Sequence, residues 1–248
     1  MIIRLDEIDS TNEYAKRFIA DGWSSDDITT VSAQYQTAGK GRRGREWVSP
    51  PGTSLMFSMF FKPKAKLDSC PIITLVCALA VREALKEFDV ETDIKWPNDI
   101  VINGRKVCGI LTEALTEQGY IIVGAGVNMT QEEWPEELRD RAVSIMEATG
   151  DCVDEDALLE RIIHHTERYL EEFYNAGDMS TLKEEYQEAL VSMGREVKVL
   201  DPEQEYSGIA MGINDKGELR VELADGSVRE VYAGEVSVDG VYGYTKER

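Results

Sequence analysis

The loop at residues 36–47 combines glycine with cationic side chains in a pattern suited to binding phosphate. It reads Gln-Thr-Ala-Gly-Lys-Gly-Arg-Arg-Gly-Arg-Glu-Trp, with three glycines interleaved among four cations. Glycine lets the backbone approach a ligand closely, so that N–H groups and cationic side chains face its anionic groups. The loop is neither a Walker phosphate loop nor a GxGxxG dinucleotide fingerprint. Taken alone, it leaves three interpretations open: phosphate binding, a nucleic-acid patch, and a flexible basic surface loop, the commonest outcome for a glycine-arginine run.

A second motif, Lys95-Trp96-Pro97-Asn98-Asp99, predicts a tight turn at the end of a strand. Pro97 fixes its own φ and keeps Trp96 out of the helical region, and Asn98 with Asp99 favours a turn. The turn would present Lys95 and Asp99 near a common site, where a lysine and a carboxylate are suited to holding a phosphate and its Mg²⁺. A tight turn with a structural tryptophan and a surface salt bridge is the commoner outcome for a lone pentapeptide.

A third segment, residues 124–129, ends an apolar strand with small residues. Small residues allow another group to pack closely, and the side-chain amide of Asn128 is suited to reading a base edge. A strand crossing that contains glycine explains the segment equally well.

The residue types that the sequence lacks narrow the mechanism. No GxSxG elbow occurs, no cysteine has a suitable histidine partner, and the two histidines, His164 and His165, are adjacent in an acidic helical stretch. We therefore expect chemistry carried by positioned charge and by lysine and arginine clamps rather than by an imidazole base.

The composition is that of an acidic globular chain. Its 248 residues are 42% hydrophobic, too many for a disordered protein, and 27 basic against 47 acidic residues give a net charge of −20. That charge argues against general affinity for nucleic acid or anionic membranes. No apolar run reaches the about 18 residues of a membrane span, and the first residues lack the features of a signal peptide. Four cysteines without a CxxC pair argue against a disulfide framework or a zinc site, so we expect a soluble cytoplasmic protein.

The charges are unevenly distributed along the chain. Residues 36–66 carry 7 basic and 1 acidic residue, whereas residues 131–190 carry 18 acidic and 5 basic residues. The acidic stretch has helical spacing, so its charges are expected on the solvated sides of helices. The basic island matters more for function, because the local potential decides where an anion binds.

Apolar periodicity and turn residues predict alternating strands and helices over the first part of the chain. Asn103-Gly104 supplies the two positive φ angles of a type I′ turn, so residues 100–111 are expected to form a hairpin. Ser10 is the expected N-cap of a first helix, with Glu13 as its capping-box partner. The other expected strands span residues 2–8, 28–34, 54–61 and 120–127, and the other expected helices span residues 72–88, 154–175 and 179–192.

After Gly194 the pattern changes to short alternating runs separated by turn residues. The runs span residues 196–200, 206–213, 218–223, 228–232 and 235–238. Five short strands in about 45 residues indicate a small β-barrel. We therefore expect two domains, residues 1–194 and residues 195–248.

The motifs together resemble one family. They follow one another as Ser10-Thr11-Asn12, residues 36–45, residues 95–99, residues 106–113 (Lys-Val-Cys-Gly-Ile-Leu-Thr-Glu) and residues 124–128. In this combination the chain closely resembles the biotin–protein ligases (biotin–[acetyl-CoA-carboxylase] ligases) over essentially its whole length. The resemblance implies an α+β fold, with a mixed sheet and flanking helices similar to class II aminoacyl-tRNA synthetases, followed by an SH3-like barrel from about residue 195.

The resemblance also implies a two-step reaction. Biotin and ATP give biotinyl-5′-AMP and pyrophosphate, with Mg²⁺ bridging phosphate charge, and a lysine of a biotin carboxyl carrier protein then takes the biotinyl group and releases AMP. Lys95 and Arg42 are the residues expected to act in the chemical step. The residues expected at biotin are Ser10, Thr11, Asn12, Gln36, Lys40, Gly41, Arg42 and Lys95. The residues expected at ATP or the adenylate are Arg45, Trp47, Asn98, Asp99 and Asn128, with Asp99 also the candidate for contact with Mg²⁺.

Two departures from the family pattern qualify the expectation. Lys40 stands where many members have arginine, so it keeps the charge but loses the bidentate fork, and adenylate retention is expected to be weaker. The first expected strand begins at Ile2, which leaves no room for the N-terminal helix-turn-helix domain of the bifunctional ligase-repressors, so we expect no operator binding. Dimerisation through sheet edges is common in the family, and this sequence leaves a homodimer open.

Three rival functions remain for comparison. A lipoate–protein ligase shares the catalytic fold and the adenylate chemistry, but the loop at 39–45 together with residues 95–99 favours biotin. A non-catalytic sensor that binds biotin or the adenylate would be expected had Lys95 or the loop cations been lost. An RNA-binding module that uses the loop arginines predicts steeply salt-sensitive binding, which the net charge of −20 disfavours.

Overall fold

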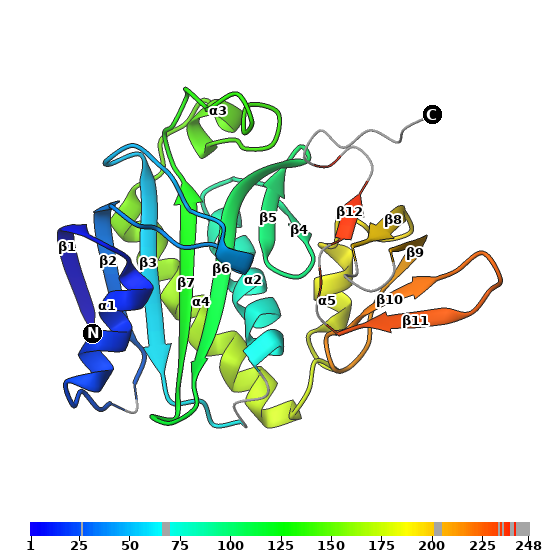
Figure 1. Ribbon diagram of the computed structural model, residues 1–248, viewed down its shortest axis with the longest axis horizontal. Helices are drawn as coiled ribbons and strands as arrows, with labels where there is room; N and C mark the ends of the chain where they lie inside the picture. Colours follow the sequence, from blue (N-terminus) through cyan, green and yellow to red (C-terminus); the bar gives the residue numbers. More distant parts are fainter. Residues whose placement is uncertain are drawn as a thin grey trace.

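The computed structural model describes residues 1–25, 27–65, 70–200, 205–232, 234, 236–238 and 241. Seven strands form one mixed sheet in the order β1-β2-β3-β7-β6-β5-β4 (Figure 1). The pair β1–β2 is parallel and the other neighbours in this sheet are antiparallel. Its strands are β1 (Ile2–Ile8), β2 (Thr29–Gln36), β3 (Ser54–Phe61), β4 (Asp93–Lys95), β5 (Asp99–Ile102), β6 (Arg105–Leu115) and β7 (Tyr120–Asn128).

Helices cover the two faces of this sheet unequally. On one face, α2 (Cys70–Lys86) and α4 (Glu155–Ala176) pack against each other and the sheet, and they enclose the larger hydrophobic core. On the other face, α1 (Thr11–Ala20) packs over β2, β3 and β7 and encloses a smaller core (Figure 1). The remaining short elements are η1 (Arg42–Gly44), α3 (Ile145–Thr149) and α5 (Lys183–Glu188). Because α1 covers only part of this face of the sheet, the strands beside it remain uncovered by helix and can form the floor of a site.

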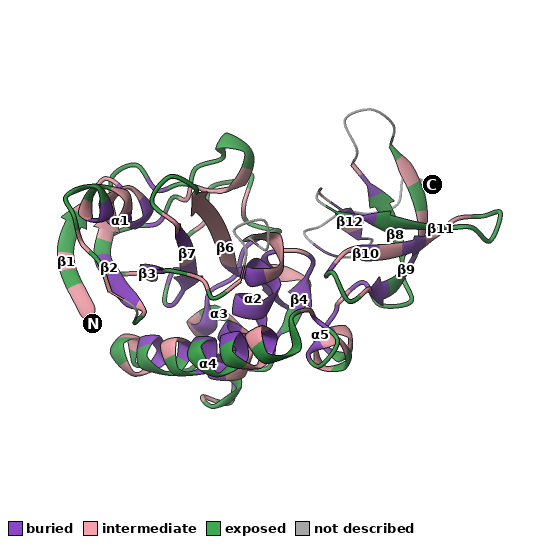
Figure 2. Cartoon of the chain, turned by 90° about the horizontal axis from the view of Figure 1, so that it is seen from below, coloured by how far each residue is buried: buried purple, intermediate pink, exposed green. Residues whose placement is uncertain are grey.

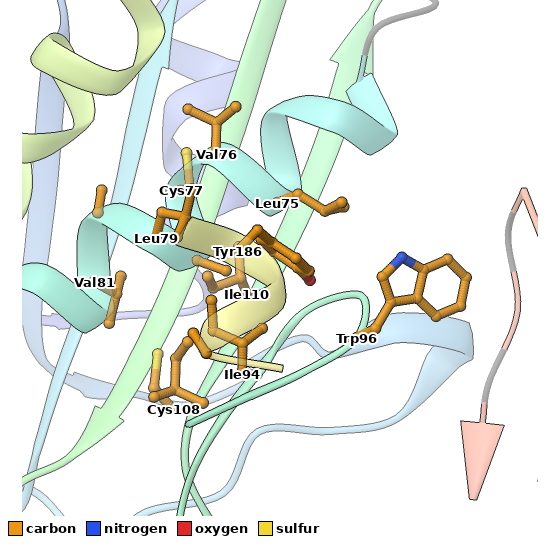
Figure 3. Packing of buried hydrophobic residues seen from close by; sticks show 14 of the residues in the cluster. Leu75, Val76, Cys77, Leu79, Val81, Ile94, Trp96, Cys108, Ile110 and Tyr186 are labelled. Atoms are coloured by element: carbon orange, nitrogen blue, oxygen red, sulfur yellow. The ribbon is translucent and has the colours of Figure 1, made fainter. Parts of the chain in front are cut away.

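The central strands are buried because both faces of the sheet are covered there. Every residue of β3 is buried, as its apolar sequence Ser-Leu-Met-Phe-Ser-Met-Phe-Phe requires, whereas β1 at the sheet edge is mostly exposed or half-buried (Figure 2). Figure 3 shows the part of the larger core where α2, the strands and Tyr186 of α5 meet.

The chain after α5 forms a second, five-stranded antiparallel sheet in the order β11-β10-β9-β8-β12. Its strands are β8 (Glu196–Val199), β9 (Tyr206–Ile213), β10 (Leu219–Glu222), β11 (Val228–Val231) and β12 (Val236–Val238). The two sheets are joined by a hydrogen bond of 3.1 Å that the indole N–H of Trp96 donates to the carbonyl of Gly217. Trp96 is 1% exposed, so it packs in the core, as expected for a tight turn that contains a structural tryptophan.

Most of the predicted elements are confirmed. Strands occur at residues 2–8 and 54–61 as expected, and Asn103 and Gly104 have φ values of 50° and 76° in the hairpin turn. The small C-terminal β domain is also confirmed, although Glu235 at the start of its last predicted strand and residues 242–248 lie outside the described residues. The boundary at residue 194 stays a prediction. In the described part of the chain, no helix is long and apolar enough to cross a membrane.

Three local predictions were wrong or incomplete. Ser10 is the N-cap of α1, but its side chain makes no capping bond in the described structure, and its N–H instead donates to Asp9 at 2.8 Å. Glu13 does not close a capping box, because its carboxylate faces Lys16 and Lys40. The predicted helix at 179–192 shrinks to α5, and the sequence pattern did not reveal the short elements β4 and α3.

Candidate active site

A first cavity lies on the α1 face of the sheet, between the start of α1, the glycine-arginine loop and strands β6 and β7. Its volume is about 50 Å³. It brings together Ser10, Thr11, Asn12, Gln36, Lys40, Gly41, Arg42, Trp47 and Asn98, all of which were expected at biotin or at the adenylate. These residues come from three separate sequence motifs, so the fold assembles what the sequence keeps apart.

The inner end of this cavity is built from hydrogen-bonding groups. The N–H and hydroxyl of Thr11 both approach the Gln36 side-chain oxygen, at 2.7 and 3.1 Å. The hydroxyl of Ser58 lies 2.7 Å from the Thr11 hydroxyl and 2.5 Å from the Asn12 side-chain oxygen. The Asn12 amide donates to Glu113 at 2.8 Å. Both ends of the Asn12 side chain are therefore used within the protein, which makes Asn12 a positioning residue for its neighbours.

Ionic contacts fix the outer edge of the cavity. Lys16 bridges the carboxylates of Glu13 and Glu113 at 2.7 and 2.8 Å, and Lys40 of the loop also reaches Glu13 at 2.7 Å. Hydrogen bonds from Lys16, and then from Lys40, hold the pKa of Glu13 below its usual value. Glu13 therefore stays ionised at neutral pH and holds the loop against α1.

A second, larger cavity of about 360 Å³ adjoins the first and shares the loop with it. Its lining includes Arg42, Arg43, Arg45 and Arg141, with Trp47 and Trp134 as aromatic neighbours; Asp99 and Glu46 are its two carboxylates among the described residues. A pocket with several guanidinium groups and two indoles suits a ligand that carries both phosphate and an aromatic base.

Five side chains stand where the two cavities meet. The Lys106 ammonium pairs with Asp99 at 2.7 Å and lies 5.6 Å from the centre of the Trp47 ring. The Arg42 guanidinium donates to the Asn98 side-chain oxygen at 2.8 Å. Lys106, Arg42, Trp47 and Asn98 line both cavities. Two cations are therefore held at the junction by neighbours on the Asn98–Asp99 turn.

Glycines form the floor beneath the junction. Gly109 of β6 and Gly126 of β7 are paired across the two strands, and the Trp47 indole lies over them. A Cβ on Gly126 would overlap the Trp47 ring, and a Cβ on Gly124 would overlap the Asn12 amide. The Trp47 indole N–H is buried without a partner in the described structure. The small residues at 124–128 thus make room for side chains of the site, as the interpretation of close packing predicted.

Among the predicted site residues, Lys95 is the one that lines neither of the two cavities. Lys95 is 7% exposed, lies opposite Asp99 in the β4–β5 pair, and lines neither cavity. Asn128 and Asp99 line the second cavity as expected, and the Asn128 amide donates to the carbonyls of Lys106 and Val143 at 3.2 and 3.1 Å.

Sequence reasoning missed several residues of the site. Lys106 begins the motif at residues 106–113, but the motif alone does not indicate a role for it, because a lysine on a strand carries no signal until its neighbours are known. Arg141 and Trp134 come from a loop whose acidic composition pointed away from function. Cys108 lies next to Gly109, but burial raises the pKa of its thiol to about 12, so it stays protonated.

Two family matches decide the relationship. Residues 5–128 match the family described as Biotin/lipoate A/B protein ligase family, and residues 192–239 match Biotin protein ligase C terminal domain. The chain belongs to the biotin/lipoate protein ligase family. The first matched region contains all the predicted site residues, and the second matched region contains the second sheet.

Individual relatives extend the family match over most of the chain. The biotin–[acetyl-CoA-carboxylase] ligase of Mycobacterium tuberculosis is 30% identical over 92% of this chain and 85% of its own length. The bifunctional ligase/repressor BirA of Bacillus subtilis is 33% identical over 85% of this chain and 66% of its own length. Among solved structures, the biotin protein ligase from Aquifex aeolicus in complex with biotin and ATP has a TM-score of 0.83 and 32% identity, and covers 96% of this chain and 98% of that one.

Proposed function

We propose that this chain is a biotin–protein ligase, which joins biotin to ATP and passes the biotinyl group to a lysine of a carrier protein. The observation that carries the proposal is the meeting of two cavities at Lys106 and Arg42, one ending in hydrogen-bonding groups and the other lined by arginines. The relative of similar structure from Aquifex aeolicus is bound to biotin and ATP.

The first cavity is proposed to hold biotin, with its head group among Ser10, Thr11 and Gln36. The ureido ring of biotin has two N–H donors and a carbonyl acceptor, whereas the dithiolane ring of lipoate has neither. A polar inner end therefore favours biotin, because polar groups left unpaired by an apolar ligand cost free energy. The cavity is smaller than the about 300–1,000 Å³ of most small-molecule sites, so we propose that its lining opens when biotin enters.

The second cavity is proposed to hold ATP and then the AMP part of the adenylate. Arg43, Arg45 and Arg141 supply charge for the phosphates, and Trp47 and Trp134 supply stacking surfaces for adenine. Asn128 supports this cavity through its bonds to the backbone at residues 106 and 143.

Adenylation takes place where the cavities meet. The carboxylate oxygen of biotin attacks the α-phosphorus of ATP, a new P–O bond forms, and the bond to pyrophosphate breaks. Negative charge accumulates on the α-phosphate oxygens, and Lys106 and Arg42 are placed to stabilise it electrostatically. We propose that Lys106 takes the role that the family resemblance implied for Lys95, because Lys106 lines both cavities and Lys95 lines neither. Lys95 is proposed to act through the turn that carries Asn98 and Asp99.

Magnesium is proposed to accompany ATP as its phosphate complex. In the described part of the chain, no group of three or more histidine, cysteine or acidic side chains forms a metal site. Asp99 offers one carboxylate in the second cavity, which fits an ion that takes most of its ligands from phosphate and water. Mg²⁺ would supply charge neutralisation of the triphosphate there.

The acceptor is proposed to be a biotin carboxyl carrier protein, and the reaction is expected in the cytoplasm. The test is transfer of labelled biotin to a purified carrier domain of acetyl-CoA carboxylase in the presence of Mg²⁺ and ATP. Label on the acceptor lysine, lost when that lysine is replaced by arginine, supports the proposal. Absence of label on the carrier in a folded sample of the protein contradicts the proposal. Transfer of lipoate in place of biotin would assign the chain to the other branch of the family.

A further inference from the structure

A third cavity, of about 170 Å³, lies between the two sheets and meets the other two cavities at Arg42. Its walls come from the start of α2, the Trp96-Pro97 turn, β6, and the β9–β10 turn of the C-terminal domain. Ile110 and Leu111 also line the first cavity, so the two cavities are neighbours along β6. Figure 3 shows Leu75 and Trp96 at the edge of the core.

The position of this cavity matters because of the chemistry at Arg42. Under the proposed function, the acyl chain occupies the first cavity and the nucleotide the second, so the mixed anhydride lies where they meet. The acceptor amine must reach the acyl carbon while both cavities are filled. Among the cavities that share Arg42, the third is left open for that approach.

The lining suits the side chain of a lysine. Leu75, Trp96, Pro97 and Ile110 offer apolar surface for its methylene stem, and none of its described lining residues is acidic. The charged groups are Arg42 at the inner end and Lys216 at the outer end. Apolar surroundings and nearby positive charge both favour the neutral form of an amine, which is the form that attacks an acyl carbon.

The outer end is exposed and firmly held. Lys216 is exposed, and the side chain of Tyr232 beside it is 61% exposed, so a partner can reach both. The turn that carries Lys216 is fixed on either side: Asp215 pairs with Lys183 at 2.5 Å, and Gly217 accepts the Trp96 indole N–H. Lys216 therefore lies on a fixed turn, and Tyr232, directly after β11, adds an exposed tyrosine, a residue type enriched at contact points between proteins.

We propose that this third cavity admits the acceptor lysine, and that the carrier segment around that lysine docks on Lys216 and Tyr232. The inference rests on the proposed function and specifies the surface at which its protein substrate binds. The lysine nitrogen attacks the acyl carbon, a C–N bond forms, and the C–O bond to the phosphate breaks. AMP leaves with the electron pair of that bond, and the amine proton passes to solvent.

Two variants of the exposed Lys216 test the docking surface. Lys216→Trp obstructs the outer end, and Lys216→Glu reverses its charge without filling it. Lys198→Glu is the matched control, because Lys198 is an exposed cation of the same domain and lines none of these three cavities. Each protein is assayed for biotin-dependent ATP–pyrophosphate exchange, for attack of hydroxylamine on the preformed adenylate, and for transfer to the carrier domain of acetyl-CoA carboxylase.

The expected result is selective loss of protein transfer. For Lys216→Trp, kcat/KM for the carrier falls about tenfold or more, a change of about 1.4 kcal/mol, while exchange and hydroxylamine cleavage stay within about twofold of the starting protein. Lys216→Glu is expected to lower carrier kcat/KM in the same way, and Lys198→Glu to leave it unchanged. Normal carrier transfer by Lys216→Trp would overturn the docking proposal alone. Absence of biotin-dependent exchange in the unmodified protein would overturn the ligase function itself.

Discussion

At the scale of single residues, the site depends on how two lysines from neighbouring motifs are placed. Lys95 and Lys106 both lie close to Asp99, Lys95 as its strand partner and Lys106 through an ion pair. The sequence motifs could not show which of the two lysines lies at the reaction centre. A motif does not reveal which side chains come together once the strands pair. The pairing of β5 with β6 favours Lys106, since it brings Lys106 to the junction of the cavities.

Substitution of these lysines by glutamine tests the ranking. Lys106→Gln keeps a hydrogen-bond donor near Asp99 but removes the charge, so biotin-dependent ATP–pyrophosphate exchange is expected to fall about 10²-fold or more. Lys95→Gln is the matched variant and is expected to keep exchange within about tenfold, because Lys95 lines neither cavity. The reverse order of the two losses would refute the assignment of Lys106.

The Glu13 carboxylate makes a pH-dependent contribution to stability. Its pKa is lowered in the folded protein, so its contribution is present above the unfolded value of 4.5 and is lost as the pH falls through the folded value. Glu13→Gln is expected to lower the free energy of unfolding by about 1 kcal/mol at pH 7. The difference from the unmodified protein should shrink below pH 4.5.

Urea unfolding at several pH values measures this effect. Glu117→Gln serves as the control, because Glu117 is an exposed residue of the β6–β7 turn. The free energies of unfolding of Glu13→Gln and the unmodified protein are compared down to pH 3, which is about one unit or more below an ordinary carboxyl pKa. A difference that stays constant over this range would rule out the ionic contact as its cause.

At the scale of elements, the pattern of apolar and turn residues predicted most of the sheet but not how helix ends are satisfied. The run at 54–61 and the Asn103-Gly104 turn carry strong local signals, and both were confirmed. The capping box at Ser10 and Glu13 failed because Glu13 lies beside Lys16 and Lys40, and a charged partner outweighs a backbone N–H for a carboxylate. Such competition depends on tertiary neighbours that no local pattern reveals.

The packing of strands β6 and β7 against Trp47 gives a prediction at this scale. Gly126→Ala places a methyl group in the space of the Trp47 indole, so the loop shifts and the KM for biotin is expected to rise about tenfold. Trp47→Leu removes the overlapping ring atoms. In the Trp47→Leu background, Gly126→Ala should therefore cost much less than in the unmodified protein.

The KM for biotin in the four proteins of this cycle is the measurement. Equal effects of Gly126→Ala in both backgrounds would mean that the methyl group acts without Trp47, and the steric account would be wrong. Tryptophan fluorescence of the Gly126→Ala variant gives an independent record of the indole environment.

At the scale of the whole molecule, one buried tryptophan links the two sheets. Trp96 packs in the larger core and donates its indole N–H to Gly217 of the C-terminal domain. Trp96→Phe is expected to lower the free energy of unfolding by about 1–3 kcal/mol, because the Gly217 carbonyl loses its donor and a cavity remains. Trp23→Phe is the matched control, since the Trp23 indole N–H has no hydrogen-bond partner in the described structure.

Urea unfolding at neutral pH compares the two variants. A loss for Trp96→Phe no larger than that for Trp23→Phe would show that the hydrogen bond between the sheets adds no stability. The sequence identified Trp96 as structural, but its partner 121 residues away in the chain was beyond any local pattern.

The central claim is that the two cavities hold biotin and ATP and join them at Lys106 and Arg42. Isotope exchange between ATP and pyrophosphate, run with biotin, with lipoate and with neither, tests it most directly. The account predicts exchange that requires Mg²⁺ and biotin and that is absent with lipoate or without an acid. Exchange with lipoate but not with biotin, or no exchange with either in a folded sample, would contradict it.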